Sequence, residues 1–146
     1  MTSYEGRCLC RGLRYAIRPP TLFVAHCHCR WCREAHGAAY VTWVGAAVER
    51  FELLDGQDLL GWYQSTAQSR RGFCRRCGTT LFFSTQLAPG EIHVTRASLP
   101  GEIDRRPELH CFFDQHADWT SVGDELPRYD SDADGLVRSR VVPGRE

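Results

Sequence analysis

The stretch that decides the fold is His26-Cys27-His28-Cys29-Arg30-Trp31-Cys32-Arg33, which carries three cysteines in a C-x-C-x2-C pattern. Two cysteines separated by one residue are poorly placed for an unstrained disulfide with each other. Three thiolates that converge over one turn suit a metal, and zinc takes cysteine sulfur at about 2.3 Å in a tetrahedron. Structural zinc sites fill all four positions, whereas catalytic sites keep one open. We therefore expect Cys27, Cys29 and Cys32 to form a zinc site without an obvious fourth ligand.

Two further cysteine pairs lie far apart in the chain, Cys8 with Cys10 and Cys74 with Cys77. The second pair is followed by Gly78 and by a strand-like run, a pattern typical of a zinc knuckle in which glycine lets backbone N–H groups turn toward sulfur. Each pair lacks two ligands, and together they make a closed four-cysteine set of the structural kind. The alternative is that these four are free buried cysteines.

Five residues are candidates to close the three-cysteine site: Cys111, His26, His28, His36 and His93. Cys111 alternates with apolar neighbours, so we expect a small core side chain rather than a ligand. Along an extended segment His26 and His28 should point away from the adjacent cysteines, which favours packing or support of the ligands. The sequence therefore leaves the fourth position open or filled by something weaker than a thiolate.

Length and composition describe one domain. The chain has 146 residues, 42% of them hydrophobic, and a net charge of zero, which favours neither disorder nor electrostatic binding to nucleic acid. Lysine and asparagine are absent, which points to a GC-rich, bacterial genome. The first residues lack a signal peptide and no apolar run reaches the ~18 residues that cross a membrane, so we expect a cytoplasmic protein. In that compartment closely spaced cysteines indicate metal ligands rather than disulfides.

Short apolar and β-branched runs predict a mainly β fold with little helix. We expect strands at 13–17, 22–26, 40–44, 50–54, 59–63, 69–73, 91–95 and 108–113, with another leaving the 74–78 turn. Residues 34–36 suggest a single helical turn that Gly37 ends. The predicted organisation is one zinc domain over residues 1–129 and a C-terminal tail over 130–146.

The order of these motifs resembles the glutathione-dependent formaldehyde-activating enzymes, the family that also includes centromere protein V. The resemblance is carried by G-x-C-x-C from Gly6, H-C-H-C-x-x-C-R from His26, F-C-x-x-C-G-T-x-L-F from Phe73, and Leu126-Pro127-Arg128-Tyr129 as the family's usual ending. It implies a β-tent fold with two zinc ions per chain, a structural one at Cys8, Cys10, Cys74 and Cys77 and a catalytic one at Cys27, Cys29 and Cys32. Arg11 departs from the pattern, since the family usually has glycine there; Gly12 follows and is expected to compensate.

The chemistry expected of the open site follows from its charge. Zinc with three thiolates carries a net charge of about −1, so it suits a fourth thiolate better than it suits making hydroxide from water. For glutathione and formaldehyde, the resemblance implies formation or cleavage of S-hydroxymethylglutathione, a carbon–sulfur lyase reaction. His36 is a candidate for moving the proton. Arg33, Arg75 and Arg76 are candidates for binding the glutathione carboxylates.

The rival interpretation is a zinc-stabilised binding module of the same fold without catalytic activity. In that case Arg70, Arg71, Arg75 and Arg76 would contact a partner, although the zero net charge argues against nucleic acid. A protein ligand in the fourth zinc position favours the module, and an open position favours the enzyme. A third interpretation keeps the site and changes the thiol or the aldehyde.

Overall fold

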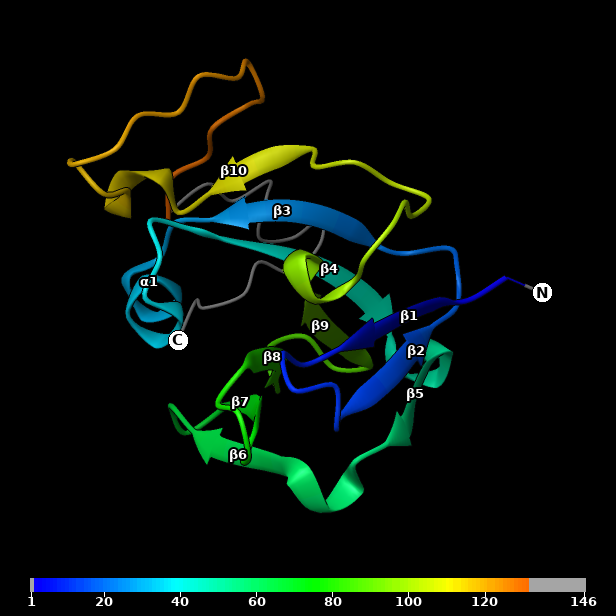
Figure 1. Cartoon of the computed structure of the whole chain (residues 1–146). Coiled ribbons are helices and arrows are strands. Elements are labelled where there is room, and N and C mark those ends of the chain that lie inside the picture. Colours follow the sequence, from blue (N-terminus) through cyan, green and yellow to red (C-terminus); the bar gives the residue numbers. More distant parts are fainter. Residues whose placement is uncertain (1, 132–146) are drawn as a thin grey trace.

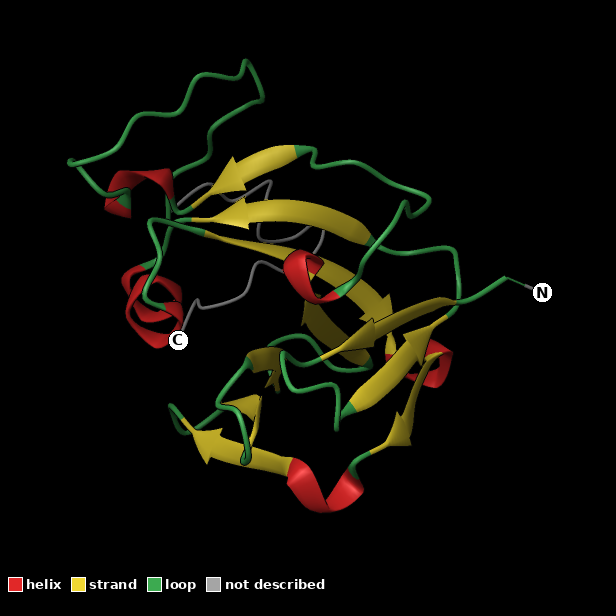
Figure 2. Ribbon diagram, viewed as in Figure 1, coloured by secondary structure: helices red, strands yellow, loops and turns green. Residues whose placement is uncertain are grey.

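The computed structural model describes residues 2–131, and within them the chain is mainly β, as the sequence predicts. It has ten strands, one α-helix and four 3₁₀ turns at Val48–Arg50, Gln57–Leu59, Arg96–Ser98 and Phe113–Gln115. Apart from its first two residues, the expected tail at 130–146 lies outside the described residues. Figure 2 shows strands dominating the fold, with helical segments only short.

The strands form two sheets (Figure 1). The larger has the order β10 (Leu109–Cys111), β3 (Phe23–Cys27), β4 (Val41–Ala47), β9 (Glu91–Thr95), β8 (Thr80–Thr85), β7 (Ser69–Cys74) and β6 (Leu60–Gln64). The smaller has the order β1 (Tyr4–Arg7), β2 (Arg14–Ile17) and β5 (Phe51–Asp55). The pair β10–β3 is parallel and the other pairs are antiparallel.

The main core lies where β2 of the smaller sheet meets one face of the larger sheet. Tyr15 and Ile17 are fully buried there with Val24, Val44 and Phe82. The rings of Tyr15 and Phe82 meet edge to face with centroids 5.0 Å apart, a favoured aromatic geometry. Side chains alternate between the two faces of a strand. Because Val24 and Val44 point into this core, the residues next to them in β3 and β4 point to the opposite face of the sheet.

That opposite face carries a second core, and it holds the three-cysteine stretch. Ala25 and Cys27 of β3 pack there with Trp43, Phe83 and Cys111, all of them buried. The helix α1 (Arg30–His36) follows β3 directly and lies at its end in Figure 1. The period-two pattern of β3 therefore aims Cys27 at the side of the sheet where α1 begins.

Most strand boundaries lie within one residue of the predictions, although β4 continues to Ala47, and three other differences have local causes. The helix α1 begins at Arg30, inside the cysteine stretch, because Cys29 caps it, and Gly37 ends it in a left-handed conformation as predicted. The strand β1 had no clear alternating pattern, since Gly6 leaves room for the Tyr15 ring that covers it. The last strand ends at Cys111 because Phe112 adopts a positive φ of 55°.

Arg11 also adopts the left-handed conformation, with φ of 67°. This is the position at which the resemblance expects glycine, and the expected compensation by Gly12 is wrong, because Gly12 is not among the residues of positive φ. Gly12 instead permits a close approach: a Cβ there would lie 2.1 Å from Nη2 of Arg76. The turn between Cys8 and Leu13 thus keeps a strained arginine.

Replacing Arg11 by glycine is expected to raise the free energy of unfolding by about 1 kcal/mol. A left-handed backbone costs a non-glycine residue roughly 1–2 kcal/mol, and part of the gain is offset by glycine's freedom in the unfolded chain. Urea denaturation of the zinc-loaded protein measures the change. Arg106→Gly, at an exposed arginine without positive φ, is the matched control and should be destabilising. Equal destabilisation by both changes would contradict the strain at Arg11.

Candidate metal centres

The structure brings Cys8, Cys10, Cys74 and Cys77 together, with all four sulfurs within 4.8 Å of one another. The Sγ atoms of Cys8 and Cys10 are 3.5 Å apart, and those of Cys10 and Cys74 are 3.9 Å apart. A tetrahedral zinc with bonds of about 2.3 Å separates its sulfurs by about 3.8 Å. The cluster therefore fits a zinc ion with shifts of a few tenths of an ångström.

Polar hydrogens surround this cluster. The backbone N–H groups of Cys10 and Leu13 lie 3.5 and 3.4 Å from the sulfurs of Cys77 and Cys8, and Nε of Arg76 lies 3.3 Å from the sulfur of Cys10. The backbone N–H of Gly12 and then the Arg76 guanidinium lower the pKa of Cys10. Such donors stabilise thiolates that share one metal.

The three-cysteine stretch forms a second cluster, in which the sulfurs of Cys27, Cys29 and Cys32 also lie within 4.8 Å of one another. Cys27 ends β3, Cys29 is the N-cap of α1 and Cys32 lies in its first turn. The Cys29 sulfur accepts a hydrogen bond from the backbone N–H of Cys32 at 3.3 Å. All three residues are fully buried, so this is a water-poor site.

Arg71 of β7 compensates charge at this second cluster. Its Nη1 and Nη2 lie 3.6 and 3.7 Å from the Cys32 sulfur, and Nε1 of Trp43 donates to the same sulfur at 3.4 Å. Hydrogen bonds from Cys27 and Cys29, followed by the charge of Arg71, lower the pKa of Cys32 well below its usual value. With zinc and three thiolates the cluster would carry about −1, which the guanidinium neutralises.

Sequence reasoning missed Arg71 as a site residue. The rival interpretation places Arg71 among the arginines that contact a partner, but the residue is only 7% exposed and its guanidinium lies over the Phe83 ring. The signal in the sequence was slight: Arg71 falls two residues before Phe73 and three before Cys74 in a strand. Its pairing with Cys32 depends on the packing of α1 against the sheet, which no local pattern reveals.

The described residues offer three sulfurs at this cluster and no fourth ligand within the same 4.8 Å limit. Cys111 is the strand partner of Cys27 in the β10–β3 pair and, after burial, is the main cause that raises the pKa of the Cys27 thiol. It nevertheless stays outside the group of three. The imidazoles of His26 and His28 are also outside it and contact Thr42 and His110 instead.

A cavity of about 720 Å³ lies beside the four-cysteine cluster, and none of Cys27, Cys29 and Cys32 lines it. Its lining includes Cys8 and also His36, the last residue of α1. The His36 ring packs edge-on against Trp43, whose Nε1 donates to the Cys32 sulfur. Nδ1 of His36 lies 2.9 Å from Oγ1 of Thr80. Burial lowers the pKa of His36 to about 4, so the ring is neutral at pH 7.

The arginines at the cavity are not those expected from the sequence. The lining includes Arg7, Arg11 and Arg96, and none of Arg33, Arg75 and Arg76. Arg33 and Arg75 donate instead to the backbone oxygens of Gln115 and Leu60, respectively. Arg76 donates to the Cys10 sulfur. Arg96 is itself tied to the carbonyls of Leu99 and Gly101. Among the described residues, the arginines of the lining whose side chains make no hydrogen bond or ion pair are therefore Arg7 and Arg11, from the strand and turn that flank Cys8.

These features define a β domain with one cluster of four cysteine sulfurs, one cluster of three, and a cavity beside the first. The chain matches the family described as glutathione-dependent formaldehyde-activating enzyme over residues 3–115, and it belongs to that family. The family resemblance read from the sequence is thereby confirmed.

Two relatives illustrate the match. The chain is 36% identical over 88 residues to the Schizosaccharomyces pombe protein named uncharacterized lyase C29B12.13, a stretch that covers 58% of this chain and 59% of that protein. It also resembles the crystal structure of a Rhodobacter sphaeroides protein, with a TM-score of 0.60 and 21% identity, covering 85% of this chain and 98% of the other. The second likeness shows a shared fold. Among the described residues, no helix has the length and apolar character required to span a bilayer.

The two clusters should differ in what their loss does. Cys74→Ser removes a ligand from the cluster that joins the two sheets, so we expect the protein to unfold or aggregate, since structural zinc is worth on the order of 10 kcal/mol. Cys29→Ser should give a soluble, folded protein with one zinc fewer per chain. Metal analysis and thermal melts of both variants measure this. Equal loss of folding would contradict the assignment.

Cys111 provides a test of the fourth position. Cys111→Ala should keep the zinc content of the protein and cost roughly 1 kcal/mol of stability from lost packing. Metal analysis after exhaustive dialysis gives the content, and urea denaturation gives the stability. One zinc fewer in this variant would mean that Cys111 closes the cluster, which would favour a purely structural site.

Proposed function

We propose that the chain makes or breaks the carbon–sulfur bond between a glutathione-type thiol and a small aldehyde. With formaldehyde the product is S-hydroxymethylglutathione. The observation that carries the proposal is the group of three buried sulfurs, with no fourth ligand among the described residues, which Trp43 and His36 connect to a cavity lined by arginines. Membership of the formaldehyde-activating family and a relative named as a lyase support it.

The donor set determines which substrate group binds. Zinc held by Cys27, Cys29 and Cys32 would favour a soft fourth ligand and deprotonate a thiol that binds to it. Arg71 offsets the charge of the thiolates and, being buried, does so without competition from water. Burial of the three cysteines excludes water, which favours thiol over hydroxide chemistry. We therefore propose two zinc ions per chain, with only the one at this cluster taking substrate.

The atoms of the proposed reaction balance without an oxidant. The sulfur electron pair adds to the carbonyl carbon, the C=O π pair moves onto oxygen, and that oxygen takes the proton lost by the thiol. His36 is the candidate to move this proton, since it is neutral and lies between the cavity and Trp43. Because the pKa of His36 is low, this imidazole accepts a proton only from a group whose own pKa has been lowered. A thiol bound to a metal ion would be such a group.

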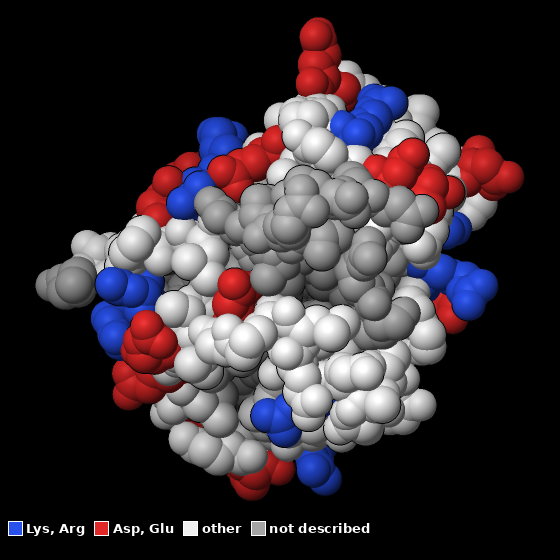
Figure 3. Space-filling model, turned by 180° about the vertical axis from the view of Figure 1, so that it is seen from behind, with Lys and Arg blue, Asp and Glu red and all other residues white. Residues whose placement is uncertain are grey.

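The cavity supports recognition of an acidic thiol peptide. Arg7 and Arg11 line it beside Cys8, and guanidinium groups bind carboxylates with paired hydrogen bonds. The cytoplasm, where thiols are kept reduced, is the compartment that fits this chemistry. On the face shown in Figure 3 acidic and basic side chains are interspersed, and together with the net charge of zero this gives no support to nucleic-acid binding.

Cobalt substitution tests the thiol half of the proposal. Cobalt at the three-cysteine cluster should show a stronger sulfur-to-cobalt charge-transfer band when glutathione is added, and no such gain with S-methylglutathione, whose thioether has no ionisable S–H. Formaldehyde consumption with glutathione should exceed the spontaneous rate, and Cys29→Ser should reduce it to the spontaneous rate, while Cys111→Ala stays active.

The possible outcomes separate the alternatives. A cobalt spectrum that ignores glutathione would contradict thiol coordination and favour a zinc-stabilised binding module without catalysis. A spectrum that responds while formaldehyde is ignored would keep the site chemistry and require a different aldehyde. A response to other thiols equal to that with glutathione would contradict the role of Arg7 and Arg11.

A further inference from the structure

Two histidines lie side by side on the sheet face opposite to the buried cysteines. His26 of β3 and His110 of β10 are register partners in the parallel pair, and their ring centroids are 4.8 Å apart. Their neighbours Cys27 and Cys111 belong to the core on the other face, because side chains alternate along each strand. The two imidazoles therefore belong to a place distinct from both cysteine clusters.

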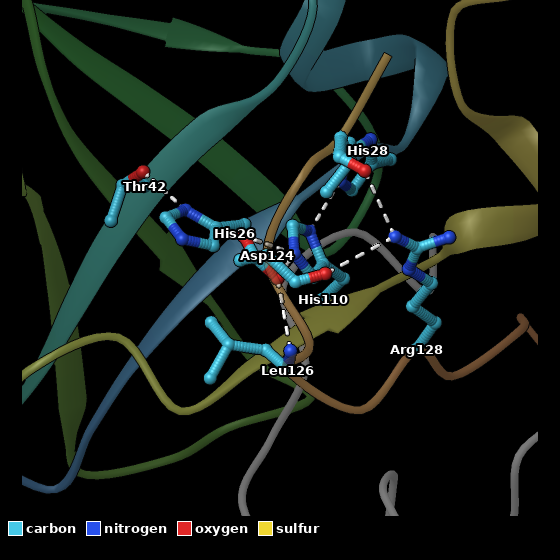
Figure 4. A network of polar contacts seen from close by, with 8 residues as sticks. His26, His28, Thr42, His110, Asp124, Leu126 and Arg128 are labelled. Carbon is cyan, nitrogen blue, oxygen red and sulfur yellow. Dashed lines mark hydrogen bonds and ion pairs between the residues drawn. The ribbon is translucent and has the colours of Figure 1, made fainter.

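Asp124 completes a group of three at this place (Figure 4). Its carboxylate oxygens lie 3.0 and 3.1 Å from Nε2 of His110. The backbone N–H of Leu126 donates to Oδ1 of Asp124 at 3.0 Å, which orients the carboxylate. The segment that follows pairs with His110, whose carbonyl accepts from the backbone N–H of Tyr129 at 2.9 Å. The loop that carries Asp124 is thus anchored beside the imidazoles.

We propose that His26, His110 and Asp124 form a third metal site, which takes a divalent first-row transition ion such as zinc or cobalt(II). One ligand atom from each residue lies within 4.8 Å of the others. A tetrahedral zinc with nitrogen and oxygen ligands at about 2.0–2.1 Å separates them by about 3.3 Å. Closing the group on an ion therefore needs the ligand atoms to approach one another by at most about 1.5 Å. Two imidazoles and one carboxylate are an established donor set for such ions, with positions left for water.

Each of the two imidazoles has a polar neighbour at Nδ1, as metal-ligating histidines usually do. Nδ1 of His26 lies 2.7 Å from Oγ1 of Thr42, and Nδ1 of His110 lies 2.8 Å from Nε2 of His28. When each Nδ1–H donates to these acceptors, each Nε2 keeps a lone pair for an ion, as is usual for ligating histidines. In that tautomer Nε2 of His110 faces the Asp124 carboxylate, and a cation between the two lone pairs stabilises the arrangement.

The group of His26, His110 and Asp124 is buried on one side and open to solvent on the other. His110 is fully buried, whereas the side chain of Asp124 is 41% exposed, so an ion can enter from the solvent side. Nδ1 of His28, behind His110, is buried without a hydrogen-bond partner. With one carboxylate the filled site carries about +1, opposite in sign to the three-cysteine cluster. The ion would join β3, β10 and the Asp124 loop at the sheet edge.

The test uses full-length protein without an oligohistidine tag, loaded with two zinc ions per chain, so that the cysteine clusters are filled and the proposed third site is left free. Titration with cobalt(II) should add one ion per chain, with visible d–d bands and no sulfur-to-cobalt charge-transfer band. Asp124→Asn, which keeps the shape of the side chain, should weaken this binding about tenfold or more. His26→Gln should do the same, whereas Asp118→Asn, an exposed acid of the same segment, should bind as the parent does.

Thermal melts supply an independent measurement. An ion that binds only the folded state raises the melting temperature, so cobalt(II) should stabilise the parent and Asp118→Asn but not Asp124→Asn. The proposal is overturned if no further ion binds, if Asp124→Asn binds cobalt as tightly as the parent, or if the added ion shows sulfur charge transfer. None of these measurements involves a thiol or an aldehyde. Failure of the third metal site would therefore leave the proposed function unaffected, and failure of the proposed function would leave the third metal site unaffected.

Discussion

Four sulfurs drawn from two sheets are the constraint on which the rest of the fold depends. Cys8 and Cys10 follow the first strand of the smaller sheet, and Cys74 and Cys77 sit in the turn between β7 and β8 of the larger one. Thiolates this close repel one another unless a cation lies among them. The packing of the two sheets is therefore linked to the ion that these sulfurs fit, and the cavity that Cys8 lines lies beside this junction.

The strand β3 distributes the chemistry of the molecule between two faces. Its odd positions, ending at Cys27, point into the dry core where Arg71 balances charge, and His26 points to the face shared with Thr42 and His110. Soft and hard donor sets are thus separated by one peptide unit. A shift of one residue in the β3 register would exchange the two sets, so the pairing with β4 and β10 specifies which metal chemistry lies on which face.

Much of this arrangement is readable from the sequence because cysteines that gather into one cluster are closely spaced along the chain. The cysteine groups, most strands and the glycine end of α1 are local patterns. What escaped prediction depends on contacts between distant segments. Arg71 reaches Cys32 across 39 residues, and Arg7 and Arg11 reach the cavity through the turn that holds Cys8. Arg11 keeps a backbone conformation that glycine adopts more easily, which suggests that its guanidinium is retained for the cavity.

The two cysteine clusters also differ in when they can be completed during synthesis. Cys27, Cys29 and Cys32 leave the ribosome almost together. Cys10 can join Cys74 only after the 64 residues that separate them have been synthesised. At about 5–20 residues per second the wait is several seconds. During that time the first thiol pair is exposed to oxidants and to competing metals. The order of translation therefore makes the amino-terminal thiols the vulnerable ones, and a supply of reductant and zinc matters most before the second half of the chain has been made.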